Sequence, residues 1–182
     1  WEDLGYDGTG VNIAIIDTGI DYTHAVFGGS GNPGDYAAND PDIIETGTFP
    51  TAKVVGGYDF AGTDYDAGSD VVTNTIPVAD PDPLDEYDHG THVASIAAGI
   101  AAGDVMTGVA PMAKLFALKV FGAGGSTNLV PDALEWVADH NETAAVADKI
   151  HVINMSLGSN WGPNDVTDPE MVWIDNLTAS GV

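Results

Sequence analysis

Three short apolar runs rich in β-branched residues are the feature that most restricts how this chain can fold. They span residues 11–16, 115–120 and 150–155, each is bounded by turn residues, and a weaker run spans 53–58. Near-continuous apolar runs of this length are typical of strands in a parallel sheet that is covered on both faces. We therefore expect a parallel sheet rather than an antiparallel one.

Two segments with helical periodicity alternate with these runs. The first spans residues 89 to about 102, with Asp88 as the predicted N-cap and Gly103 after the last turn. The second spans about 128–140, with Pro131 in its first turn. The expected buried faces are Val93, Ile96, Ala97 and Ile100 in the first helix and Leu134, Val137 and Ala138 in the second. Strands alternating with such helices predict an α/β fold, a doubly wound parallel sheet with right-handed crossovers.

Two stretches, 28–50 and 62–86, fit neither pattern. They are rich in Gly, Asn, Asp and Pro and are expected to be long surface loops. In a compact domain such loops are more often functional than idle. No internal repeat and no domain linker interrupts the chain, so we expect a single domain.

The charge of the chain restricts its partners. Four Lys and no Arg stand against 28 Asp and Glu, a formal charge of −24. Nucleic acid and anionic membranes both need a basic surface, so neither is an expected partner. A solvated acidic surface explains the charge, and calcium binding by residues 64–70 or 80–88 is the alternative. The absence of Cys excludes disulfides and thiolate metal sites.

Asp17 follows the first apolar run directly. In open α/β sheets, ligands and catalytic groups gather at the carboxyl ends of the strands. A carboxylate beside a buried strand is costly unless another group pairs with it. Taken alone, Asp17 could also be an ordinary turn residue.

The pentapeptide Asp-His-Gly-Thr-His at 88–92 opens the first predicted helix and allows three interpretations. His89 and His92 could form part of a zinc site, although no third ligand is evident. They could also be two polar residues of a first helical turn. Alternatively, His89 is a general base whose tautomer is set by a buried carboxylate, for which Asp17 is suitable.

Five motifs in chain order resemble the subtilase family of serine proteases. They are Ile-Ile-Asp-Thr-Gly-Ile-Asp at 15–21, His-Gly-Thr-His-Val-Ala at 89–94, Gly-Val-Ala-Pro at 108–111, Leu-Lys-Val-Phe at 118–121 and Val-Ile-Asn-Met-Ser-Leu-Gly at 152–158. Residues 54–60, with Asp-Pro-Asp-Pro at 80–83, are similar to larger subtilases that carry an inserted protease-associated domain. No such domain lies within this chain.

The resemblance implies a secreted, extracellular endopeptidase that acts on polypeptide substrates. It implies that Asp17 is the acid and His89 the base of a catalytic triad, with His92 as a structural residue. It also implies that two segments bind an extended peptide through their backbones, as in strand addition. These segments are Gly124, Gly125 and Ser126 on one side of the substrate and Ser156, Leu157 and Gly158 on the other.

The sequence departs from the family in three places. It contains no Gly-Thr-Ser-Met-Ala nucleophile motif and no Asn in the family's oxyanion context, and the first calcium site lacks its Asp at 24–26. We therefore expect residues 1–182 to be the N-terminal part of one catalytic domain, ending before the Asn and Ser. Such a chain would be inactive without its C-terminal part. It would need no cofactor, with structural calcium left open. The alternative is a non-catalytic peptide-binding module derived from a subtilase.

Overall fold

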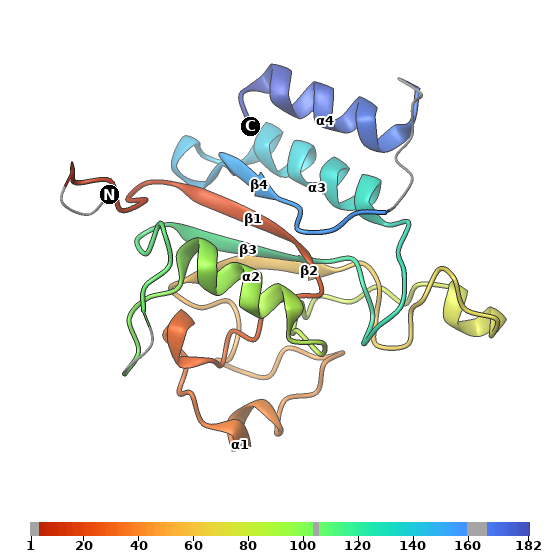
Figure 1. Cartoon of the computed structure of the whole chain (residues 1–182), viewed down its shortest axis with the longest axis horizontal. Coiled ribbons are helices and arrows are strands. Elements are labelled where there is room, and N and C mark those ends of the chain that lie inside the picture. The colour runs from red at the N-terminus through yellow and green to blue at the C-terminus, as the bar shows by residue number, and fades with distance from the viewer. Residues whose placement is uncertain (1–3, 104–105, 160–166) are drawn as a thin grey trace.

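The centre of the fold is a sheet of four parallel strands, shown by the computed structural model in Figure 1. The structure describes residues 4–103, 106–159 and 167–182. The strands are β1 (Asn12–Asp17), β2 (Val54–Asp59), β3 (Lys114–Lys119) and β4 (Val152–Asn154). Their order across the sheet is β2-β3-β1-β4, which confirms the predicted α/β parallel architecture.

All four predicted runs contain a strand, but the last strand is shorter than expected. β4 has three residues, whereas the apolar run 150–155 has six. The reason is that a side chain of helix α3 (Val130–Thr143) hydrogen-bonds the backbone of Ile150. The Asn141 side chain accepts from the Ile150 N–H at 2.7 Å and donates to its carbonyl at 2.8 Å. Strand pairing with β1 therefore begins only after Ile150.

Helices cover both faces of the sheet (Figure 1). Helix α2 (His89–Ala98) packs on one face, and α3 and α4 (Pro169–Ser180) pack on the other. Alternate residues of β1 serve the two cores: Ile13 and Ile15 join the α2 side, and Ala14 and Ile16 join the α3 side. This confirms the prediction, made from uninterrupted apolar runs, that both faces of the sheet are buried.

The buried face of α2 differs from the prediction. The helix ends at Ala98 rather than near 102, and its buried residues are Gly90, Ala94 and Ala98. Ile96, expected in the core, is 56% exposed. The buried face consists of small residues because the helix lies very close to the loop after β1. A Cβ on Gly90 would lie 2.1 Å from the Gly19 carbonyl oxygen.

The helices on the other face agree better with the sequence. In α3, Leu134 and Val137 are buried as predicted. Helix α4 was not predicted, although its boundaries carry ordinary signals. Asp168 caps its N-terminus by accepting from the Glu170 N–H, Pro169 begins it, and Gly181 ends it with φ +98°.

The two predicted loops contain little regular structure. The first carries α1 (Pro33–Tyr36) and follows directly on the 3₁₀ helix η2 (Ala25–Phe27), and the second carries the 3₁₀ helix η3 (Val72–Thr75). A further 3₁₀ helix, η4 (Val146–Asp148), precedes β4. Among the described helices, none has the length and apolar character that crossing a bilayer requires.

Candidate active site

Asp17 and His89, predicted from separate motifs, lie in direct contact. Asp17 is the last residue of β1 and is 1% exposed, and His89 is the first residue of α2. The His89 Nδ1 lies 2.7 Å from the Asp17 Oδ1. The sheet thus ends and the helix begins at the same point in space, which brings together residues 72 positions apart.

The partner of His89 determines where its proton lies. An ionised carboxylate only accepts hydrogen bonds, so the Nδ1 carries the proton and donates it to Asp17. The Thr18 N–H donates to the same carboxylate oxygen at 2.7 Å. The His89 side chain is 47% exposed, which leaves its Nε2 lone pair accessible to a reacting group. This arrangement can remove a proton from a nucleophile.

Asp85 holds the two elements of this pair together, and sequence analysis missed it. The residue is 1% exposed. Its Oδ1 accepts from the Thr18 hydroxyl at 2.8 Å, and its Oδ2 accepts from the N–H and hydroxyl of Thr91 at 2.8 and 2.6 Å. The Thr18 hydroxyl in turn accepts from the Gly90 N–H at 2.8 Å. Asp85 therefore links the residue after Asp17 to the first turn that carries His89.

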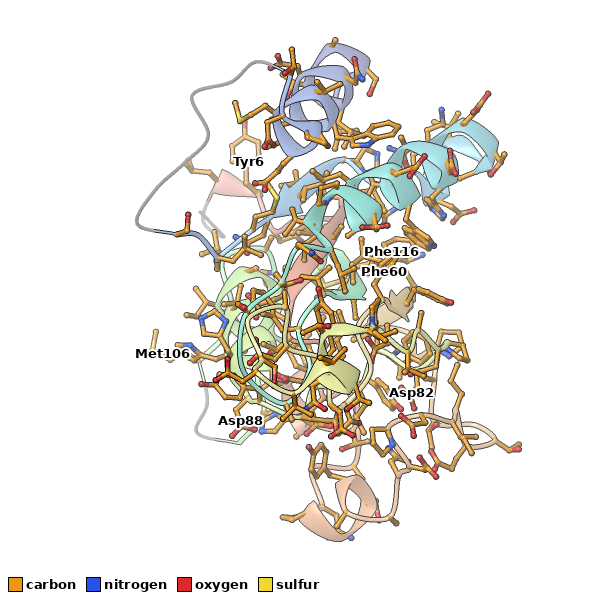
Figure 2. The ribbon with its side chains drawn as sticks, turned by 90° about the vertical axis from the view of Figure 1, so that its right-hand side faces the viewer. Tyr6, Phe60, Asp82, Asp88, Met106 and Phe116 are labelled. Carbon is orange, nitrogen blue, oxygen red and sulfur yellow. The ribbon has the colours of Figure 1, made fainter. Side chains whose placement is uncertain are left out.

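Asp88 does not cap α2 in the way that was predicted. It occupies the N-cap position, but its φ is +69° and its side chain makes no capping hydrogen bond. It is the one non-glycine residue with positive φ in the described part of the chain, and Figure 2 labels it. The capping role belongs to Asp85, whose Oδ1 also accepts from the N–H groups of Tyr87 and Asp88. This acceptor lies three residues before Asp88, so a local turn of the chain supplies it.

A buried ion cluster lies at the same end of the sheet. Lys119 ends β3, in register with Asp17 on one side and Asp59 on the other. Its Nζ lies 2.7 Å from both Asp59 Oδ2 and Glu86 Oε2. Burial alone would lower the pKa of Lys119, but the attraction of the two carboxylates outweighs it and raises that pKa. The cluster fixes Glu86 near Asp85, so it supports the loop that carries the cap.

The two predicted substrate-binding segments leave the sheet on either side of Asp17. β3, which leads to Gly124, Gly125 and Ser126, and β4, which leads to Ser156, Leu157 and Gly158, are the two neighbours of β1. Ser126 is hydrogen-bonded to the loop at 66–67 through its N–H, hydroxyl and carbonyl. The Ser156 hydroxyl donates to Asn154 Oδ1 at 2.9 Å, and none of the described hydrogen bonds joins a serine to His89.

The zinc and calcium interpretations gain no geometric support. Throughout the described ranges, no three His, Asp or Glu side chains converge as a metal site would require. The side chain of His92 is exposed on α2. His24, at the position of the family's first calcium site, caps η2 by accepting from the Val26 N–H.

Comparison with known proteins shows which family the sequence matches. The model of the "Subtilase family" of peptidases matches residues 8–181. Minor extracellular protease Vpr of Bacillus subtilis (strain 168) is 36% identical over 94% of this chain, which covers 17% of that protein. A PII-type proteinase of Lacticaseibacillus paracasei is 32% identical over the whole chain, which covers 9% of it. Subtilisin E of Bacillus subtilis (strain 168) is 31% identical over 98% of the chain, which covers 34% of it. The chain thus spans about a third or less of the length of each of these relatives.

Proposed function

The chain belongs to the subtilase family, and from this membership we propose that it forms part of a serine endopeptidase that cleaves peptide bonds with an Asp-His-Ser triad. Asp17 is the acid of this triad and His89 is its base. The observation that carries the proposal is the 2.7 Å contact between the His89 Nδ1 and the buried Asp17 carboxylate. A histidine oriented in this way is what nucleophilic catalysis by a serine needs.

The proposed reaction is acyl transfer. The serine oxygen bonds to the carbonyl carbon of the scissile peptide while the His89 Nε2 takes the hydroxyl proton. Asp17 stabilises the imidazolium that results, because its Oδ1 accepts the proton on Nδ1. The C–N bond then breaks, and His89 returns its proton to the leaving amine. A water molecule releases the acyl group by the same steps in reverse, with His89 again as the base.

Residues 1–182 do not contain the serine in the family's motif. The seven Ser residues of this sequence all lie outside a Gly-Thr-Ser-Met-Ala context, and no Asn lies in the family's oxyanion context. We propose that the Ser and the oxyanion Asn come from a C-terminal part of the same catalytic domain. The 182-residue polypeptide by itself is then expected not to hydrolyse peptides, and normal protease rates from it would contradict this assignment.

The proposed substrate is an extended polypeptide lying between the segments that follow β3 and β4. Small residues such as Gly124, Gly125 and Gly158 suffice there because the backbone makes the contacts. Secretion is part of the proposal and is supported by the relative named as an extracellular protease. The charge of −24 disfavours nucleic acid and anionic membranes as partners.

The test uses the intact natural protein with a casein substrate and a serine-directed phosphonylating reagent. We expect His89→Ala to lower kcat by about 10⁶-fold, as in subtilisin. Asp17→Asn should lower it by about 10⁴-fold, because an amide favours the wrong tautomer of His89. The matched control is His92→Ala, which removes an exposed histidine from the same helix and should leave kcat within about twofold. Retention of activity by His89→Ala, or no labelling of the wild-type protein by the reagent, would contradict the proposal.

A further inference from the structure

The loop that begins at residue 62 runs alongside the segment that follows β3. The Ala123 N–H donates to the Thr63 carbonyl at 2.9 Å, and the Tyr65 hydroxyl donates to Asn128 Oδ1 at 2.5 Å. Between these two points, the Ala67 N–H donates to the Ser126 carbonyl at 2.9 Å. The loop therefore braces the chain on both sides of the glycine pair, at Ala123 and at Ser126.

Asp66 makes the central contact of this brace. Its Oδ1 accepts from the Ser126 N–H at 2.9 Å and from the Ser126 hydroxyl at 3.0 Å. The same oxygen accepts from the Gly68 N–H at 3.0 Å, and the Asp66 N–H donates to the Asn74 carbonyl at 2.7 Å. Three donors on one ionised oxygen form charge-assisted bonds, which are stronger than neutral ones.

The same carboxylate lies too close to Gly125 for any side chain to fit there. Its φ is +88°, and a Cβ added to it would lie 2.3 Å from the Asp66 Cγ. A side chain at this position would therefore displace Asp66. The backbone groups of Gly124 and Gly125 make no hydrogen bond within the described part of the chain, whereas those of Ser126 are both used by the loop. In the described structure, the backbone groups of the two glycines next to Ser126 are therefore available to hydrogen-bond a peptide.

We propose that Asp66 is a positioning residue, which clamps Ser126 so that the backbone of Gly124 and Gly125 is held ready to bind an extended peptide. This inference rests on the proposed protease function and deepens it. A glycine pair has the largest conformational freedom of any dipeptide, and ordering it during binding costs free energy. A clamp that orders the pair beforehand removes that cost and strengthens peptide binding.

The test compares two substrates of the intact protease. One is an octapeptide, which reaches the clamped segment, and the other is a single-residue amino-acid ester, which does not. Asp66→Ala should raise KM for the octapeptide by about 10-fold, which equals a loss of 1.4 kcal/mol of binding, with kcat within about twofold. Its kcat/KM for the ester should stay within about twofold of wild type.

Two further variants separate the clamp from its charge and from general stability. Asp66→Asn keeps an acceptor oxygen facing Ser126 and should restore KM to within about threefold of wild type. Asp64→Ala removes the same charge from the same loop, but its exposed side chain does not contact Ser126, so KM should not change. Hydrogen exchange gives a readout that is independent of activity: the Ser126 amide should exchange faster in Asp66→Ala.

The outcomes distinguish this inference from the proposed function. Equal losses on the octapeptide and the ester, or an equal effect of Asp64→Ala, would overturn the positioning role while the protease function stands. Unchanged exchange of the Ser126 amide in Asp66→Ala would overturn the clamp itself. A wild-type protein that cleaves neither substrate and reacts with no serine reagent would overturn the protease function instead.

Discussion

Asp88 illustrates how a single residue at the edge of a site accepts an unfavourable conformation. Its φ of +69° puts it in the left-handed region, where a Cβ approaches the neighbouring carbonyl oxygen. The conformation persists because Asp85 accepts from the Asp88 N–H at 3.1 Å and so holds the backbone in place. The next residue is His89, so this bend directs the chain into the helix that starts with the proposed base.

This conformation predicts an unusual order of stability for substitutions at position 88. Asp88→Gly should be more stable than Asp88→Ala by about 1 kcal/mol, because only glycine adopts positive φ without steric cost. Thermal unfolding of the two variants of the intact protein measures the difference. Glu135, exposed on α3, is the matched control, and there the alanine variant should be the more stable one. The same order at both positions would contradict the prediction.

At the scale of elements, one carboxylate joins the end of β1 to the start of α2. Asp85 receives hydrogen bonds from Thr18, Tyr87, Asp88 and Thr91, and all of these donors lie in or next to the proposed site. A buried carboxylate whose donors come from two elements holds those elements in fixed positions, because moving either one would leave a buried polar group without its partner. The close approach of Gly90 to Gly19 adds a steric requirement to the same junction.

We therefore expect Asp85→Asn to destabilise the protein by about 2–4 kcal/mol. The amide would place an N–H group against the donors of Thr91, so at least one buried hydrogen bond would be replaced by a repulsive contact. Denaturant unfolding of the intact protein measures the loss. The variant Asp88→Asn removes a charge three residues away and should cost less than about 1 kcal/mol. A loss for Asp85→Asn no larger than for this control would exclude the linking role.

At the scale of the whole molecule, the surface carries even fewer positive charges than the composition suggests. Two of the four lysines, Lys53 and Lys119, are buried, so they do not offset the surface carboxylates. Burial lowers the pKa of Lys53 to about 8. Several carboxyls are buried as well, and Asp82, labelled in Figure 2, accepts from the Tyr22 hydroxyl at 2.9 Å.

The buried carboxyls predict a definite pH dependence of stability. Burial raises the pKa of Asp82 and of Asp80 to about 6, from an ordinary value of 3.8. Between about pH 4 and pH 6 the folded state then binds more protons than the unfolded state, so these groups lower stability as pH rises. Asp82→Asn removes one of the two contributions while it keeps an acceptor for Tyr22. Its stability relative to wild type should rise by about 2 kcal/mol from pH 4 to pH 7.

Unfolding of the intact protein in denaturant at several pH values between 4 and 7 measures this change. The matched variant Asp70→Asn removes the same charge from an exposed position in the loop at 62–86. If the two variants gained the same stability with rising pH, the effect would come from the overall charge and not from burial.

The apolar runs and the motifs next to them are the features that the sequence predicts best. The uninterrupted apolar runs predicted strands covered on both faces, because a strand that is buried on both faces has apolar residues at successive positions. The meeting of Asp17 and His89 could be expected from their places at the end of a strand and the start of a helix. Their catalytic roles remain predictions. Element boundaries and buried helix faces were predicted less well, as shown by the short β4, the unpredicted α4 and the exposed Ile96.

The sequence by itself therefore determined the class of fold and the pair of residues on which the proposed chemistry depends. Only the tertiary structure decided which side chains hold that pair and the segment beside it. Asp66, Asp85 and Glu86 lie in a loop whose scattered carboxylates have no period, and each finds partners in other parts of the chain. The physical reason is that periodicity encodes which face of an element is buried, whereas a hydrogen bond between distant loops depends on where the chain folds back.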